Sequence, residues 1–275
     1  MEGDPDGNAR KHSLVAAYSR LAPDYDRIGP RLFSHFGQRL VEFAPVRPGT
    51  AVLDVAAGRG AVLFPAAARV GEQGRAIGID LADAMVQLTA ADLHRHGLRQ
   101  AAMRRMDAEH LLFEDQSFDV VLCGFALHHF PRPAQALAEF FRVLRPGGTA
   151  AVTTWAERPA LFAWLRGALK PYEDLARFLT TPFDTPDDLE AALRQAGFVE
   201  VRVAREAADF VYADEEEWWA SNWAFLQREA LDRLAPAELQ QVKTAAFEQV
   251  RGVKRPDGMH QRWGALLAAG TKARH

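Results

Sequence analysis

The stretch Ala51-Val-Leu-Asp-Val-Ala-Ala-Gly-Arg-Gly60 decides the fold of this chain. Val52 to Val55 is apolar except for Asp54, small residues and glycines follow at once, and an apolar run from Ala61 to Val70 comes next. This order predicts a buried strand, a tight turn and a helix. Such a turn lets a ligand approach the backbone closely, beside the N-terminus of a helix. An ordinary turn in a parallel sheet has the same local pattern, so the turn alone does not identify a ligand.

An acidic residue ends the next predicted strand, Arg75 to Asp80. A carboxylate roughly twenty residues after a glycine turn suits the two hydroxyls of a ribose. The turn itself reads Ala56-x-Gly58-x-Gly60 and departs from the G-x-G-x-x-G pattern that binds a pyrophosphate. Asp54 would repel a pyrophosphate and suit a cationic ligand such as a free amino group. A nicotinamide dinucleotide is therefore disfavoured.

Strands alternate with helices at intervals typical of parallel βαβ units wound on both faces of one sheet. After the first two strands we expect strands at 101–106, 118–124 and 149–155, and helices at 61–70, 82–96 and 131–143. Ligands bind such sheets at the carboxyl ends of the strands. Five residues fall at or near those ends: Asp54, Asp80, Asp107, Cys123 and Thr154. This convergence predicts one ligand site at that edge of the sheet.

The regions before and after this core do not have its regular alternation of strands and helices. Residues 1–8 are rich in Gly, Asp and Pro and are expected to be disordered, and helices are expected at 9–18 and 31–43. After Trp155 the chain is aromatic and largely helical. We expect helices at 159–179, 185–196, 214–226 and 236–250, and strands at 198–203 (with 209–212 as an extension) and 262–271. Thr185 before Pro186, with acids in the first turn, is a good helix start.

The composition limits the class of protein. The chain has 275 residues, of which 48% are hydrophobic and 25% charged, and a formal net charge of -3, which is typical of a soluble globular protein. This charge gives no reason to expect nucleic acid or an acidic membrane surface as a partner. The single cysteine, Cys123, excludes an intramolecular disulfide and a cysteine-based zinc site. No apolar run suits a membrane span or a signal peptide, so we expect a cytoplasmic protein. We also expect a monomer or homodimer, and no bound metal.

The chain resembles a class I S-adenosylmethionine-dependent methyltransferase. More narrowly, it resembles the ubiquinone/menaquinone-biosynthesis-type branch, which contains many small-molecule and natural-product methyltransferases. The segments that carry the resemblance follow the family's order and spacing between Tyr18 and Trp155: 52–60, 78–81 with Met85, 107–108, 118–121, 127–130 and 142–148. The resemblance implies an α/β fold: a Rossmann-like, doubly wound, seven-stranded sheet whose last strand is antiparallel, with N-terminal helices and a helical cap.

The resemblance also implies the cofactor, S-adenosyl-L-methionine, with S-adenosyl-L-homocysteine as its product. It assigns the methionine end to Asp54, to the Ala56 turn and to the backbone of Cys123, the ribose to Asp80, and the adenine to Asp107 and its neighbours. The full set of expected cofactor residues is Tyr25, Asp54, Ala56, Gly58, Gly60, Asp80, Leu81, Met85, Asp107, Ala108 and Cys123. Ala56 departs from the family, which usually has glycine there, so we expect weaker or adjusted binding.

A hydroxyl acceptor must lose a proton, and a histidine suits that task near pH 7. His128, just past the fourth strand, is the candidate catalytic base. Some relatives that the chain resembles pair such a histidine with an acid at the end of the fifth strand, where this chain has Thr154. Local packing of the histidine is the other interpretation. The expected substrate residues, which would alternatively be packing residues, are Tyr18, His129, Trp155, Trp219 and Trp223.

These patterns predict an enzyme that moves a methyl group to oxygen or carbon of a small, largely apolar, secondary-metabolite-like molecule. The alternative is an enzyme of this fold repurposed for another reaction such as cyclisation, with the cofactor in a structural or electrostatic role. A non-enzymatic binding module is disfavoured because Asp54, Asp80 and Asp107 are all present. We divide the chain into an N-terminal helical lid (1–45), a cofactor-binding core (46–155) and a C-terminal part with the last two strands and a substrate cap (156–275).

Overall fold

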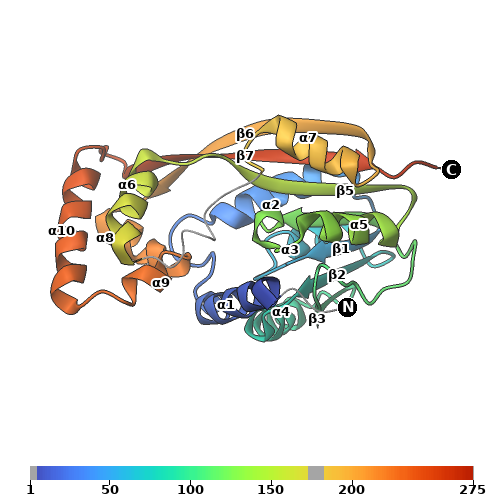
Figure 1. The fold of residues 1–275 in the computed structure, drawn as a ribbon, viewed down its shortest axis with the longest axis horizontal. Helices are drawn as coiled ribbons and strands as arrows, with labels where there is room; N and C mark the ends of the chain where they lie inside the picture. Colours follow the sequence, from blue (N-terminus) through green and yellow to red (C-terminus); the bar gives the residue numbers. More distant parts are fainter. Residues whose placement is uncertain (1–4, 173–182, 275) are drawn as a thin grey trace.

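The computed structural model describes residues 5–172 and 183–274, and a seven-stranded sheet forms its centre (Figure 1). The strands lie in the order β3-β2-β1-β4-β5-β7-β6, and β7 is antiparallel to both of its neighbours. Their bounds are β1 Ala51–Val55, β2 Arg75–Asp80, β3 Ala101–Arg105, β4 Phe118–Gly124, β5 Leu144–Glu157, β6 Val199–Tyr212 and β7 Met259–Thr271. The predicted fold class is confirmed.

Helices cover both faces of the sheet and extend beyond one end of it (Figure 1). Their bounds are α1 Pro5–Leu21, α2 Leu32–Phe43, α3 Leu63–Val70, α4 Asp83–Arg95, α5 Pro133–Val143, α6 Ala160–Leu169, α7 Pro186–Gln195, α8 Glu215–Ser221, α9 Arg228–Leu231 and α10 Pro236–Arg251. Short 3-10 turns occupy η1 Leu127–His129, η2 Lys170–Tyr172 and η4 Asn222–Ala224. None of the helices within the described ranges combines the length and apolar character that a bilayer crossing needs.

Alternation along β1 distributes its side chains between two cores. Leu53 and Val55 are fully buried on the face covered by α5 and α7. Val52 is fully buried on the opposite face, against α2 and α3. Asp54 follows the same alternation, so its carboxylate lies on the α3 side at the carboxyl end of the strand. The strand pattern therefore fixes where this charge emerges.

The N-terminal region differs from the prediction. Residues 5–8 were expected to be disordered, but α1 begins at Pro5; residues 1–4 lie outside the described part. The helix packs beside α4 (Figure 1), and Ala17 and Leu21 are buried. This tertiary packing stabilises a helix that local composition disfavours.

The last three strands are longer than predicted. β5 and β6 have 14 residues each and β7 has 13. β5 begins five residues earlier than predicted, with an irregular stretch, and the pairing of β6 with β7 continues as far as Tyr212 and Met259. The paired ends carry the cap, which α6, α8, α9 and α10 form at one end of the molecule (Figure 1). α9 was not predicted, and residues 173–179 of the expected aromatic helix lie outside the described residues.

Candidate active site

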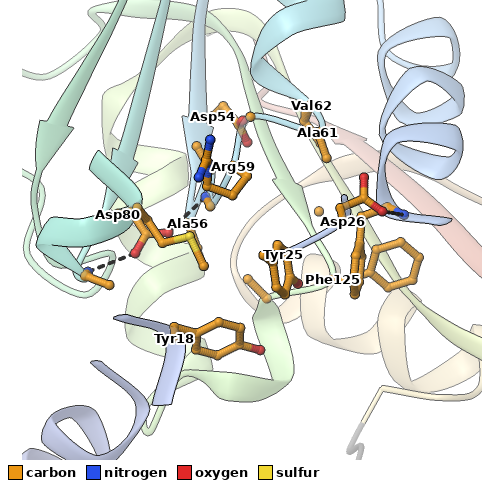
Figure 2. A pocket seen from close by; sticks show the side chains of 18 of the residues that line it. Tyr18, Tyr25, Asp26, Asp54, Ala56, Arg59, Ala61, Val62, Asp80 and Phe125 are labelled. Carbon is orange, nitrogen blue, oxygen red and sulfur yellow. Dashed lines mark hydrogen bonds between the residues drawn. The ribbon is translucent and has the colours of Figure 1, made fainter. Parts of the chain in front are cut away.

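A cavity of about 600 Å³ lies at the carboxyl ends of β1, β2 and β4. The Ala56–Gly60 turn lines one side of it, and Tyr18 and Tyr25 lie across from that turn and from Asp80 (Figure 2). This volume is in the range of small-molecule and cofactor sites. The cavity is where a doubly wound sheet binds its ligand.

The turn after β1 is built from left-handed backbone conformations. The φ angles are +55° at Ala56, +52° at Gly58 and +83° at Gly60. Glycine takes such angles readily, whereas alanine there is strained by about 1–2 kcal/mol. A Cβ atom at Gly60 would lie 2.6 Å from the Phe64 ring. The chain therefore has alanine where the family usually has glycine and still adopts the left-handed turn, with a strained backbone at Ala56.

Asp54 is a buried carboxylate beside the turn after β1. Its side chain is only 1% exposed, and among the described residues no donor meets hydrogen-bond geometry with either oxygen. Burial and the charge of Asp80 raise the pKa of Asp54 well above its usual value, and the nearby Leu63 amide offsets this only in part. Such a group favours a ligand that brings positive charge. The free amino group of S-adenosylmethionine fits this requirement.

Asp80 is held by the backbone on both sides. Its carboxylate accepts hydrogen bonds from the Gly58 and Ala82 amides, each at 2.9 Å, as the dashed lines in Figure 2 show. Burial raises its pKa, and these amide contacts counteract the rise. Each carboxylate oxygen has a second lone pair that can accept a hydrogen bond, so Asp80 fits the ribose role expected of it.

Asp107 is engaged by a lysine that sequence reasoning missed. Lys11 Nζ on α1 lies 2.6 Å from Asp107 Oδ2 and 2.5 Å from Glu109 Oε2. Burial would raise the pKa of Asp107, but the Lys11 ammonium and the Glu109 amide bring it below its usual value. Asp107 is thus an acceptor in its charged form, beside the expected adenine position. No local signal marks Lys11, because its partners lie 96 and 98 positions away in the chain.

The structure brings most of the predicted cofactor residues together around this first cavity. The lining includes Tyr25, Asp54, Ala56, Gly58, Gly60, Asp80, Leu81, Met85, Asp107 and Ala108. Cys123 does not line it; its neighbour Gly124 does. Cys123 is fully buried in the core, and burial raises the pKa of its thiol, which agrees with a packing residue. Within residues 5–172 and 183–274, no cluster of three or more metal-ligating side chains is present.

A second cavity of about 70 Å³ adjoins the first. The two share one aromatic wall, to which Tyr18, Tyr25, Phe33, Phe125 and His129 contribute. His128 and Trp155 line the second cavity, so these two predicted residues lie beyond the shared wall. The second cavity therefore lies next to the cofactor cavity, where an acceptor is expected.

The assignment of Trp219 and Trp223 to the substrate is not supported. Neither residue lines either cavity. Trp219 is buried in the core of the cap, and Trp223 packs against the same cluster. These side chains hold the cap together, because large aromatic residues contribute most to burial in such a small core.

His128 has no acidic partner at the end of β5, where the chain has Thr154. Thr154 donates its hydroxyl hydrogen bond to the Phe183 carbonyl, at 2.6 Å, and His128 Nδ1 is buried without a partner among the described residues. Burial, and then the charges of His129, Arg158 and Arg10, lower the pKa of His128 well below its usual value. The imidazole is therefore neutral at pH 7 and can accept a proton. His129 is oriented differently, with Nε2 2.9 Å from the Tyr18 hydroxyl.

The fold and the first cavity together define the class of protein: a Rossmann-like sheet with a cofactor-sized cavity that Asp54, Asp80 and Asp107 line. Residues 52–148 match the methyltransferase domain family. The chain is 38% identical over 205 residues to nocamycin O-methyltransferase of Saccharothrix syringae, covering 69% of this chain and 73% of that protein. It is 32% identical over 207 residues to aklanonic acid methyltransferase DauC of Streptomyces sp. (strain C5), covering 70% and 94%.

The fold is similar to that of the YcgJ protein of Bacillus subtilis, with a TM-score of 0.60 and 19% identity over 88% of this chain and all of that one. That likeness concerns the fold alone. The two sequence relatives show the family: the chain belongs to the S-adenosylmethionine-dependent methyltransferases, in the small-molecule branch expected from its sequence. It is a transferase, and its cofactor is S-adenosyl-L-methionine.

Proposed function

We propose that this enzyme methylates an oxygen of a small, largely apolar, secondary-metabolite-like molecule. The observation that carries the proposal is the pairing of the Asp54–Asp80 cofactor site with an adjoining cavity walled by Phe33, Phe125 and Trp155. Aromatic walls suit an apolar acceptor. The relative named nocamycin O-methyltransferase supports oxygen over carbon as the methylated atom.

When bound, S-adenosylmethionine supplies an electrophilic methyl group on a sulfonium. The chain's own residues then have three tasks. Asp54 and Asp80 hold the cofactor by charge and by hydrogen bonds, so that its orientation is fixed before the acceptor arrives. Tyr18 and Tyr25, both half-buried, form part of the shared wall and exclude water from it. His128, neutral at pH 7, accepts the proton of the acceptor hydroxyl.

The arrangement of the whole protein follows from the same proposal. The N-terminal lid (1–45) closes the site, and the core (46–155) binds the cofactor. The C-terminal part (156–275) encloses the acceptor. The partner is a small molecule, and neither nucleic acid nor membrane takes part. A formal net charge of -3 supports this, because it provides no attraction to polyanions. We further propose a cytoplasmic monomer or homodimer.

Transfer of a labelled methyl group tests the proposal. The full chain is incubated with S-adenosylmethionine labelled in the methyl group and with a panel of hydroxylated polyketides and naphthoquinones. Label should appear in at least one acceptor, on oxygen, together with S-adenosylhomocysteine. Conversion of an acceptor without transfer of label would contradict the proposal and favour a repurposed reaction such as cyclisation. Label on carbon would refute the assignment of the atom.

A further inference from the structure

Several buried polar atoms of residues that line the second cavity have no hydrogen-bond partner among the described residues. Apart from the histidine nitrogens, whose role depends on the tautomer, these atoms are donors. Gln227 Nε2, Trp263 Nε1 and Arg166 Nε are buried without a hydrogen-bond partner among the described residues. Gln227 is 6% exposed and Trp263 is 3% exposed, so neither reaches bulk water readily. A buried donor left unpaired is destabilising by itself. These three donors are therefore arranged for a ligand that brings acceptors.

Two arginines give the same cavity a positive charge. Arg158 and Arg166 both line it, and no aspartate or glutamate appears among its described lining residues. Burial, and then the charge of Arg166, lower the pKa of Arg158, whereas Asp184 nearby partly opposes this. Like charges brought together in a half-buried place are unfavourable unless an anion joins them. Among the described residues, Asp184 is the carboxylate whose charge acts on Arg158.

Most of the remaining wall of the cavity is aromatic. Ring centroids lie 5.0 Å apart for Phe162 and Trp263, 5.1 Å for Trp155 and Trp263, and 4.2 Å for Phe125 and Trp155, which are stacked. Flat conjugated rings pack well against such surfaces. The free volume of about 70 Å³ accommodates a small functional group, so the ring body of a larger molecule would lie along the shared wall.

We propose that Arg158 and Arg166, with Gln227 and Trp263, bind an anionic oxygen group on a flat conjugated acceptor and so select acidic substrates. The inference rests on the proposed function and refines its substrate class. Guanidinium groups bind carboxylates and other paired anionic oxygens with directional, charge-assisted hydrogen bonds. A neutral analogue would bring no anionic group to the two arginines. The site therefore discriminates by charge as well as by shape.

Binding of matched acid and amide probes tests this inference without requiring methyl transfer. The full chain is saturated with S-adenosylhomocysteine, and quenching of its tryptophan fluorescence is followed during titration with anthraquinone-2-carboxylate and with anthraquinone-2-carboxamide. We expect the carboxylate to bind at least about tenfold more tightly. In Arg158→Met and in Arg166→Met the preference should fall to less than about threefold. Arg99→Met, at an exposed position outside both cavities, should keep the full preference.

Several outcomes would overturn the inference. These are equal affinity for the two probes, failure of the carboxylate to bind, and a preference that survives in the double variant Arg158→Met/Arg166→Met. Affinity for S-adenosylhomocysteine is measured in every variant and should stay within about threefold of the wild type, since neither arginine lines the first cavity. A wild-type protein that does not bind S-adenosylhomocysteine would instead refute the proposed function. Failure of the inference and failure of the proposed function are therefore distinguishable.

Discussion

Lys11 on the first helix and Asp107 after the third strand form an ion pair at the cofactor cavity, with 2.6 Å between Lys11 Nζ and Asp107 Oδ2. The same ammonium reaches the buried carboxylate of Glu109, which Arg132 also contacts at 2.9 Å. Lys11 itself lines the cavity. Ion pairs therefore hold α1 against the segment that follows β3, and one of the two acids, Asp107, also lines the cofactor cavity.

The first prediction concerns the ion pairs that Lys11 forms with Asp107 and Glu109. Lys11→Met should decrease the free energy of unfolding by about 1–2 kcal/mol, because Glu109 remains buried with Arg132 as its remaining cationic partner. It should also speed hydrogen exchange of residues 9–21. Mass-spectrometric exchange with and without S-adenosylhomocysteine provides the measurement. Lys243→Met, which removes an exposed pair with Glu216, should change stability by less than about 0.5 kcal/mol.

In the wild type, cofactor should slow exchange in residues 9–26, since α1 and Tyr25 line the cavity. Equal exchange rates in residues 9–26 with and without cofactor would mean that this region is not a lid.

The second prediction concerns the buried charge of Asp54. Without cofactor the folded protein retains a proton on Asp54 that the unfolded chain releases near pH 4. The free energy of unfolding contributed by this residue therefore decreases as pH rises from about 4 toward its raised folded-state pKa. Asp54→Asn removes this dependence and should stabilise the cofactor-free protein at pH 7 by on the order of 1–3 kcal/mol. Urea unfolding at several pH values measures it, and an unaltered pH slope in the variant would refute it.

The third prediction concerns backbone strain at Ala56. Ala56→Gly removes the unfavourable left-handed alanine at φ +55° and should raise the free energy of unfolding by about 0.5–1 kcal/mol, after the larger entropy of the unfolded glycine chain is subtracted. Cofactor affinity should stay equal or increase. Ala57→Gly is the matched control, since Ala57 does not have a positive φ, and it should lose about 0.5–1 kcal/mol. Destabilisation of both variants alike would show that Ala56 is not strained.

The fourth prediction concerns His128. His128→Ala should slow methyl transfer to a hydroxyl acceptor by at least about a hundredfold while leaving cofactor affinity unchanged. Because burial keeps the pKa of His128 well below its usual value, the wild-type rate should show no histidine limb between about pH 6 and 8. Single-turnover rates over that range give both results, with His12→Ala as an exposed control. A His128→Ala enzyme that works at the wild-type rate would exclude the base.

Local patterns in the sequence predicted the core and its cofactor edge well. The strand, turn and helix around Asp54 depend on neighbours in the chain, and the spacing to Asp80 and Asp107 places all three carboxylates at one edge of the sheet. The structure confirms the sheet and its antiparallel last strand.

Features that depend on contacts distant in the chain were not predictable. Lys11 meets Asp107, and Arg166 meets the cavity that Trp263 closes, only after the chain has folded. Tryptophan content alone could not separate Trp155, which lines the second cavity, from Trp219, which packs in the cap. The long β6–β7 pairing likewise depends on tertiary context, which overrides local strand preference.

Calorimetric titration with S-adenosylhomocysteine tests most directly the central claim, that Asp54 holds the amino group of the cofactor. The wild type should bind one molecule per chain. Asp54→Asn should bind at least about a hundredfold more weakly, because the variant loses the charge that faces the ligand's amino group. Asp83→Asn, an exposed acid at the start of α4, should bind within about threefold of the wild type. Wild-type affinity in a folded Asp54→Asn variant would contradict the account.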